Sequence, residues 1–240
     1  MKDPGLEHLA PEIDQVRSLV AAEVRSCGSE LWELVRNELD TFGAALPPAL
    51  VILSAKPFQY RPQPILPLAC VLQFIYLATR IHFFPAGKMA LPVLAGDLLY
   101  TKFFSCLCRH HCLEFLSPLA EAICHIHEGG AIRCMGNHRS FPHCLKVIDR
   151  VSAGLLKEAC RLGALAGNAP QDKVETLAEF GFYLGRVWGL VEERIGGKAW
   201  QKFLSKARRK LAFLPLGQEK PLLEAIIGRL EVLATEALGG

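Results

Sequence analysis

The acidic pair Glu192–Glu193 is the first candidate for chemistry, because carboxylates can bind a divalent cation. Adjacent residues on a helix do not share a face, whereas residues three or four apart do. We therefore interpret both glutamates as solvated helix charges rather than as a magnesium site. Asp97 is the next candidate, but its place near the start of a predicted helix favours a capping role. Arg80 and Lys88 could bind an anion, and we expect both to be solvated at the surface.

Cysteines and histidines are concentrated between residues 106 and 144, which contain six of each. Zinc binds such side chains, and the candidate ligands are Cys108, Cys112, Cys124 and His127. Cys108 and Cys112 are four residues apart and would share one helix face. No Cys-x-x-Cys pair is present, however, and buried free cysteine is an ordinary core residue. We favour structural cysteines and expect no metal there.

The elements that must position these residues are helices. Apolar residues recur with helical spacing over 11–27, 30–42, 65–82, 95–116, 118–128, 144–166, 173–194, 198–212 and 219–237. Residues 49–54 could form either a strand or a helix, 54–64 form a proline-rich loop, and Gly129–Gly130 ends a helix. With 51% hydrophobic residues, the 240-residue chain suits a single domain over 1–240 with a frayed tail at 238–240.

Composition limits the partners and the compartment. A net charge of +3 does not indicate a nucleic-acid partner, and the basic cluster at 206–210 is interpreted as a solvated helix face rather than a membrane-surface or anion-binding patch. The apolar run Ile65–Thr79 is shorter than the roughly 20 residues of a membrane span, which predicts a core helix and at most peripheral membrane contact. Nine cysteines without a secretory pattern predict reduced thiols and a cytoplasmic location.

Four blocks of the sequence, in order, resemble the trans-polyprenyl diphosphate synthases. They are Gly43–Leu50, the helix end at His82 followed by Leu94–Leu99, Ile148–Leu156, and Phe180–Gly196 with its matching Gly181, Leu184 and Gly185. The resemblance covers roughly residues 15 to 235. It implies a single-domain, all-α helical bundle of the isoprenoid synthase type, shortened toward the C-terminus.

The residues that carry the family's chemistry differ at most of these positions. The cations that hold diphosphate in the family are replaced by Ala44, Pro47 and Val151. In the first aspartate-rich motif His82 is kept, while Phe83, Phe84 and Gly87 stand at acidic positions. In the second, Glu192 and Glu193 replace the aspartate pair, and Gly196 replaces the last aspartate. We therefore expect no magnesium site and no catalysis by the chain alone.

The resemblance implies an accessory subunit of a heterodimeric hexaprenyl or heptaprenyl diphosphate synthase, supporting the synthesis of a quinone side chain such as that of menaquinone. The expected partner is the catalytic large subunit, or a second copy when the chain is alone. The expected contact residues are Leu98, Leu99, Phe103, Phe104 and Leu107.

Two alternatives remain open. One is an isoprenoid-binding protein whose cavity, lined by Phe74, Phe83, Phe84 and Trp188, holds a neutral prenyl chain. The other is an active enzyme of altered chemistry that uses Glu192, Glu193, Asp97 or a metal held by the cysteines and histidines.

Overall fold

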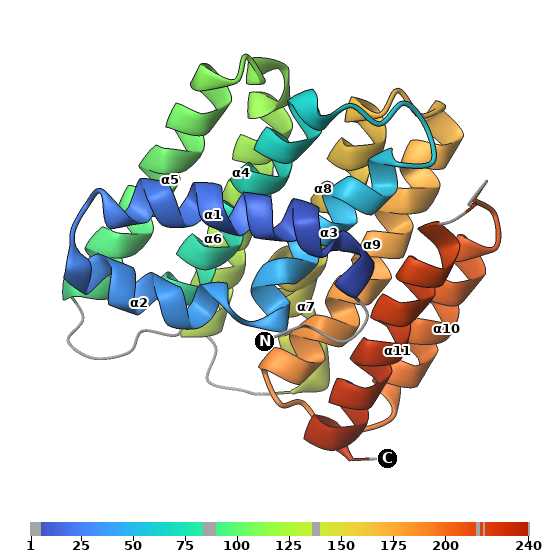
Figure 1. Ribbon diagram of the computed structural model, residues 1–240. Helices are drawn as coiled ribbons and strands as arrows, with labels where there is room; N and C mark the ends of the chain where they lie inside the picture. The colour runs from blue at the N-terminus through green and yellow to red at the C-terminus, as the bar shows by residue number, and fades with distance from the viewer. Residues whose placement is uncertain (1–5, 84–89, 136–139, 215–216, 218, 240) are drawn as a thin grey trace.

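The computed structural model describes residues 6–83, 90–135, 140–214, 217 and 219–239, and over these ranges the chain forms helices and no strand (Figure 1). The all-α fold predicted from the sequence is confirmed. The helices are α1 (Ala10–Arg25), α2 (Ser29–Leu39), α3 (Phe42–Ala55), α4 (Pro62–Phe83), α5 (Ala90–Arg109), α6 (Leu116–Met135), α7 (Phe141–Arg150), α8 (Ser152–Ala166), α9 (Gln171–Glu192), α10 (Ala199–Leu211) and α11 (Glu219–Leu238). Short 3-10 turns precede α1 (Glu7–Leu9) and α6 (Leu113–Phe115).

Two central helices, α3 and α4, form the core. All 14 residues of α3 are buried, as are all residues of α4 from Ile65 to Thr79. A helix that is apolar on every side has no solvent face and must be surrounded. Other helices accordingly pack around this pair, and one core cluster extends from Leu6 to Ala234.

A buried polar side chain compensates for one of the two prolines inside α3. Pro48 has no N–H, so the carbonyl of Ala44 loses its partner four residues ahead. Gln73 of α4, which is 0% exposed, donates a hydrogen bond from Nε2 to that carbonyl at 3.2 Å. The polar residue that interrupts the apolar sequence of α4 therefore satisfies the backbone of its neighbour.

Glycines set the spacing of the helices beside this core. A Cβ at Gly163 of α8 would lie 2.3 Å from the carbonyl oxygen of Val51 in α3. Cβ atoms at Gly181 and Gly185 of α9 would lie 2.3 Å from the carbonyl oxygen of Leu156 and 2.5 Å from the Cα of Ala153. The backbones of α3, α8 and α9 are in direct contact, which a larger residue at these positions would prevent.

Among the residues that the structure describes, two helices are long and apolar enough to cross a membrane, Pro62–Phe83 and Leu91–Arg109, and the bent pair α2–α3 would be a third. In the tested window of α4, 89% of the residues are buried within the protein, against 33% in that of α5. The burial expected for Ile65–Thr79 is therefore observed, although the helix has 22 residues rather than about 15.

Several predicted boundaries are wrong. Of the two alternatives for residues 49–54, helix is correct, because these residues lie inside α3. The loop predicted at 54–64 is reduced to residues 56–61. The Gly129–Gly130 pair lies within α6, where the two glycines give room to Val151 and to Phe83. The segment 144–166 is two helices, because the backbone turns at Val151 between α7 and α8. The predicted frayed tail overlaps the end of α11 at Leu238, and Gly240 lies outside the described residues.

Candidate functional site

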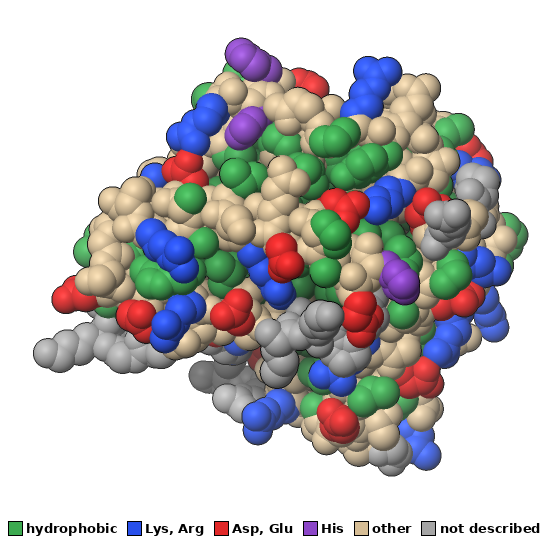
Figure 2. Space-filling view, in the orientation of Figure 1, with side chains coloured by type: hydrophobic (Ala, Val, Ile, Leu, Met, Phe, Trp, Pro, Cys, Tyr) green, Lys and Arg blue, Asp and Glu red, His purple; other side chains and the backbone are tan. Residues whose placement is uncertain are grey.

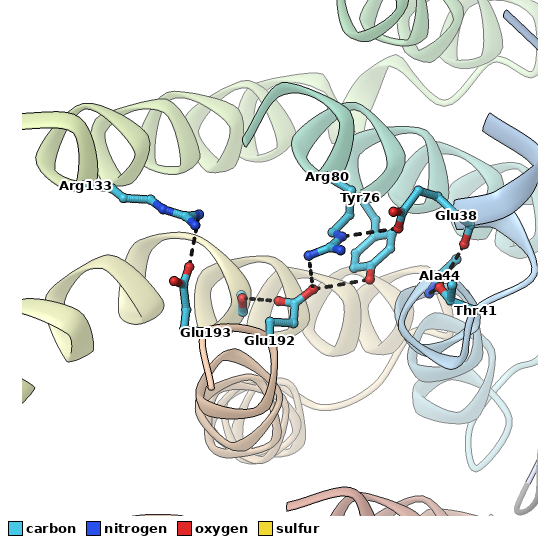
Figure 3. A network of polar contacts seen from close by, with 9 residues as sticks. Glu38, Thr41, Ala44, Tyr76, Arg80, Arg133, Glu192 and Glu193 are labelled. Atoms are coloured by element: carbon cyan, nitrogen blue, oxygen red, sulfur yellow. Dashed lines mark hydrogen bonds and ion pairs between the residues drawn. The ribbon is translucent and has the colours of Figure 1, made fainter. Parts of the chain in front are cut away.

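Glu192 lies at the end of α9 and points into the protein, where it joins a network of polar contacts (Figure 3). Its Oε2 accepts a hydrogen bond from Ser152 Oγ at 2.9 Å, and its Oε1 accepts one from Tyr76 Oη at 3.3 Å. The side chain is 9% exposed. The expectation that Glu192 is a solvated helix charge is therefore wrong, because the last turn of α9 packs against α4 and the start of α8.

Arg80 supplies the positive charge in this network. Its Nη1 lies 3.3 Å from Glu192 Oε1, and its Nε donates to Glu38 Oε2 at 3.2 Å. Arg80 is 21% exposed, so the expected solvated surface position is also wrong. This guanidinium links α2, α4 and α9.

Burial and charge act in opposite directions on the groups of this network. Burial raises the pKa of Glu192 above its ordinary value, while the nearby Arg80 and the hydrogen bonds from Ser152 and Tyr76 oppose that rise. Burial, and the negative charge of Glu192, raise the pKa of Tyr76 as well. The phenol is therefore a hydrogen-bond donor and not a base.

Glu193 points in another direction, as predicted for adjacent helical residues. It pairs with Arg133 of α6 at 3.0 Å, and its side chain is 26% exposed. Since an arginine partner neutralises it, Glu193 is not a simple solvated charge either.

The end of α4 brings an apolar and a polar side chain to the same region. Phe83 packs against Gly130 of α6, where a Cβ would lie 2.5 Å from its ring. The ring of His82 lies against Gly96 of α5, and its Nε2 is 3.4 Å from Asp97 Oδ1. Three further expected positions, Phe84, Gly87 and Lys88, lie outside the described residues.

Asp97 does not cap a helix. Because α5 begins at Ala90, Asp97 lies in its second turn, and its side chain is 63% exposed. The Gly96–Asp97 step serves helix packing instead: the glycine admits the ring of His82, and the carboxylate lies beside that ring.

A pocket of about 840 Å³ is lined by residues from both positions at which the resemblance implies an aspartate-rich motif. Its lining includes His82, Phe83, Glu192, Glu193 and Gly196. The structure thus brings together residues about 110 positions apart in the sequence, at the ends of α4 and α9. Deeper in the protein, beside Tyr76 and Glu192, the free space is only about 20 Å³, which is room for about one water molecule.

Two of the three substituted cation positions lie in the interior. Ala44 and Pro47 are buried in α3, where Thr41 caps the helix by accepting from the N–H of Ala44 at 3.2 Å. Val151 is half-buried at the junction of α7 and α8, beside the small cavity. These three side chains bring no positive charge to the pocket.

The candidate zinc ligands are dispersed. Cys112 lies beyond the end of α5 and is buried, whereas Cys108 and Cys124 are exposed, so the expected shared helix face is wrong. The ring of His127 is tilted against that of Tyr100 at 5.5 Å and lies edge-on to that of His82 at 6.0 Å. Within the described part of the chain, no three His, Cys, Asp or Glu side chains are grouped to hold a metal ion.

Comparison with known proteins agrees with this geometry. Residues 87–192 match the polyprenyl synthetase family. The chain is 26% identical over 227 residues to a geranylgeranyl diphosphate synthase of Methanosarcina mazei, covering 84% of this chain and 67% of that one. The chain is therefore similar to the polyprenyl synthetases over this range.

Solved structures share the fold. A decaprenyl diphosphate synthase from Rhodobacter capsulatus superposes with a TM-score of 0.81 at 19% identity, covering 97% of this chain and 98% of the other. The small subunit of a geranyl diphosphate synthase from Antirrhinum majus gives a TM-score of 0.66 at 16% identity, covering 90% and 98%. The expected isoprenoid synthase fold is confirmed.

The magnesium that the resemblance implies for polyprenyl synthetases does not fit the side chains of this pocket. Both carboxylate oxygens of Glu192 already accept hydrogen bonds, and the Arg80 cation 3.3 Å away would repel a divalent ion. Phe83 offers no oxygen ligand. A hard cation needs several oxygen donors, and this chain does not present them at Glu192.

The five residues expected to contact a partner occupy different environments. Leu99, Phe103 and Leu107 are 0% exposed, because they form the stripe of α5 that packs on α4. Only Phe104, at 49%, is well exposed, and Leu98 is half-buried. The expected contact is therefore wrong for three residues, and the outward face of α5 is carried by Leu94, Phe104 and Cys108.

Sequence reasoning missed four members of the polar network: Glu38, Tyr76, Arg133 and Ser152. One signal was available for the network as a whole. Arg80 is a lone cation at the end of a long apolar helix, and a buried cation requires an acidic partner. Which acid serves that role depends on how the helices pack, and this information is absent from the local sequence.

Proposed function

We propose that this chain is a non-catalytic member of the polyprenyl synthetase family that associates with a catalytic polyprenyl diphosphate synthase. The observation that carries the proposal is the ion pair between Arg80 and Glu192. It places a cation of the chain on the carboxylate that stands at the second aspartate-rich position.

The chemistry of prenyl transfer supports this proposal. Ionising an allylic diphosphate creates a leaving group with several negative charges, which metal ions must neutralise. Here one acidic position holds Phe83, and the two remaining glutamates are each paired with an arginine, Arg80 or Arg133. The cation positions that would grip the diphosphate hold Ala44, Pro47 and Val151.

The outer face of α5 supplies a surface for the partner. Its apolar window is only 33% buried, with Leu94 66% and Phe104 49% exposed. Exposed apolar patches of this kind mark contacts with other proteins. A relative of the same fold is named as a small subunit, which supports a multi-subunit assembly. We place this assembly in the cytosol, in the synthesis of a quinone side chain.

The test is co-expression of the tagged chain with a catalytic polyprenyl synthase of the same organism. We expect the two to co-purify and the product chain length to differ from that of the synthase alone. The double variant Leu94→Glu/Phe104→Glu should abolish co-purification, because it charges the exposed face of α5. Val232→Glu on α11 is the matched control, since Val232 is 45% exposed and far along the chain from α5.

Two outcomes would contradict the proposal. The first is retention of the partner by the double variant to the same extent as by Val232→Glu. The second is turnover of farnesyl diphosphate with magnesium by the purified chain alone, which would favour an enzyme of altered chemistry.

A second candidate function is binding of a neutral isoprenoid in the 840 Å³ pocket, whose walls include Phe83, Phe141 and Ile195. The deep tunnel that this function would require is not formed beside Tyr76, where side chains leave about 20 Å³. Only the outer pocket could therefore hold a chain. Quenching of tryptophan fluorescence by farnesol would support this function, and its loss in Phe83→Asp would locate the site.

A further inference from the structure

The charge of this protein is concentrated in one segment near its C-terminus. Residues 194–218 contain seven of the 27 Lys and Arg residues and none of the 24 Asp and Glu residues. The rest of the chain is therefore net acidic, although the whole carries +3. Most of the segment is α10, so its cations have fixed positions on a helix.

The inward face of α10 is apolar and accounts for its packing. Trp200, Phe203, Leu204, Ala207 and Leu211 are buried. The spacing of three and four residues between them fixes the rotation of the helix, so the opposite face must point to solvent. Lys198, Lys202 and Arg209 lie on that opposite face and are exposed.

Neighbouring helices neutralise only the flanks of this face. Arg208 pairs with Glu231 of α11, and Lys210 pairs with Glu179 of α9. The central residues Lys198, Lys202 and Arg209 have no ion pair with any described residue. In the cluster at 206–210, Arg208 and Arg209 are exposed as expected, whereas Lys206 and Lys210 are half-buried. The unpaired charge extends further toward the N-terminus of α10.

An exposed aromatic side chain continues this face. Phe213 is 69% exposed, although Leu211 and Leu214 on either side of it are buried. Lys173 Nζ donates to the carbonyl oxygen of Phe213 at 3.2 Å, which holds the turn against α9. The structure thus keeps a large apolar ring in water at the end of a basic stripe.

We propose that the face defined by Lys198, Lys202, Arg209 and Phe213 binds the surface of an anionic lipid bilayer. Cations attract acidic headgroups, and an aromatic ring at their level inserts at the interface. The three cations span about 16 Å along the helix, which suits several headgroups rather than one small anion. In Figure 2 basic side chains recur along the edge of the molecule formed by α10 and α11.

The lipid surface is preferred to an acidic protein or a nucleic acid because of Phe213. A partner bound by charge alone would gain no binding energy from an exposed apolar ring beside the cations. This inference goes beyond the accessory function and does not depend on it, since α10 and α5 are different surfaces.

The test is flotation of the full-length chain with vesicles of phosphatidylcholine, with or without about a third phosphatidylglycerol. We expect binding only to the anionic vesicles, and weaker binding as salt rises. Each cation near such a surface strengthens binding by about fivefold, so Lys202→Glu/Arg209→Glu should weaken it by more than about 25-fold. Phe213→Ser should weaken it by about tenfold without a change in net charge.

The matched control is Lys146→Glu/Lys157→Glu, which changes the net charge equally with exposed residues of α7 and α8. We expect this control to lower binding far less than the α10 variant. Equal losses in the two double variants, or equal binding to neutral vesicles, would overturn the proposal. Binding of single-stranded RNA that competes with the anionic vesicles and is unaffected by Phe213→Ser would assign the face to nucleic acid instead.

Discussion

At the scale of single residues, Arg80 determines the character of the pocket. Its guanidinium lies between Glu38 and Glu192, and the hydrogen bonds from Tyr76 and Ser152 complete the shell of the buried carboxylate. Removing one partner of a buried ion pair costs more than the pair itself contributes, because a charge is left without compensation. The network should therefore be sensitive to single substitutions.

We predict that Arg80→Met lowers the free energy of unfolding by about 3 kcal/mol at neutral pH, as measured by urea denaturation. The control is Arg133→Met, which breaks a similar arginine–glutamate pair at a more exposed place. It should cost about 1 kcal/mol or less. Equal losses in the two variants would show that burial of Glu192 does not matter.

The side chains of this network could be predicted only in part from the sequence. The substitutions at Phe83, Glu192 and Gly196 are evident from the resemblance. The different directions of Glu192 and Glu193 follow from their adjacent positions on a helix. The partner of Arg80 is not, because Glu38 and Glu192 are 42 and 112 residues away from it. Contacts between distant segments depend on the packing angles of helices, which no local pattern encodes.

At the scale of helices, contact between backbones holds α8 and α9 together. Gly181 and Gly185 lie over the backbone of Leu156 and Ala153, so close that a side chain at either glycine would collide with that backbone. The neighbour at each site is main chain, which cannot turn aside as a side chain could. Overpacking must therefore separate the two helices.

We predict that Gly185→Ala lowers the free energy of unfolding by about 2 kcal/mol. Gly228→Ala on α11 is the control, because nothing lies within 4 Å of its added Cβ. That change should raise stability by about 0.5 kcal/mol, since alanine is the better helix former. Thermal unfolding of the two variants would decide, and destabilisation by Gly228→Ala would contradict the explanation.

The ion pairs that join α1 to α5 predict that the stability of the protein depends on pH. Hydrogen bonds from Arg109 and Lys102 lower the pKa of Glu23 below its ordinary value. A carboxyl whose folded pKa is lowered stabilises the protein above its unfolded pKa of about 4.5, and the stabilisation disappears as the pH falls through the folded value. Glu23→Gln should therefore cost about 1 kcal/mol at pH 7 and almost nothing near pH 3.

Melting temperatures of wild type and Glu23→Gln, taken at several pH values between these limits, would test this dependence. Ser18→Ala, an exposed change on the same helix, serves as the control. A difference between wild type and Glu23→Gln that is constant with pH would contradict the role of the ionised carboxylate.

The helices themselves were largely predictable, and the errors have physical causes. Amphipathic helices such as α10 and α11 are evident from the helical spacing of their apolar residues. In α3 the helix was hard to predict, because it contains two prolines and its apolar run has no helical periodicity. It forms nevertheless, because it is buried on all sides and the hydrogen bond from Gln73 offsets the missing N–H of Pro48. On α5 the apolar residues were visible, but their division between the core and the surface followed from the rotation of the helix against α4.

At the scale of the whole molecule, one core joins the first helix to the last. The buried cluster runs from Leu6 to Ala234 without division. A continuous core of this kind favours a single cooperative transition, although a chain of this length often populates intermediates.

We predict that urea unfolding followed by tryptophan fluorescence coincides with unfolding followed by far-ultraviolet circular dichroism. The three tryptophans report on α2, α9 and α10, at Trp32, Trp188 and Trp200. Coincident midpoints would indicate one cooperative unit. Two separate transitions would instead show that α10 and α11 unfold independently.

The rigid pair α8–α9 has a consequence for geometry. In Figure 1 the outer face of α5 and the edge formed by α10 lie on opposite sides of the molecule, and the glycine-packed helices stand between them. If a synthase binds one side of this chain and a bilayer binds the other, the chain would fix the distance and the tilt between the synthase and the bilayer. This chain would then determine how the active-site entrance of the synthase faces the lipid that takes up its apolar product.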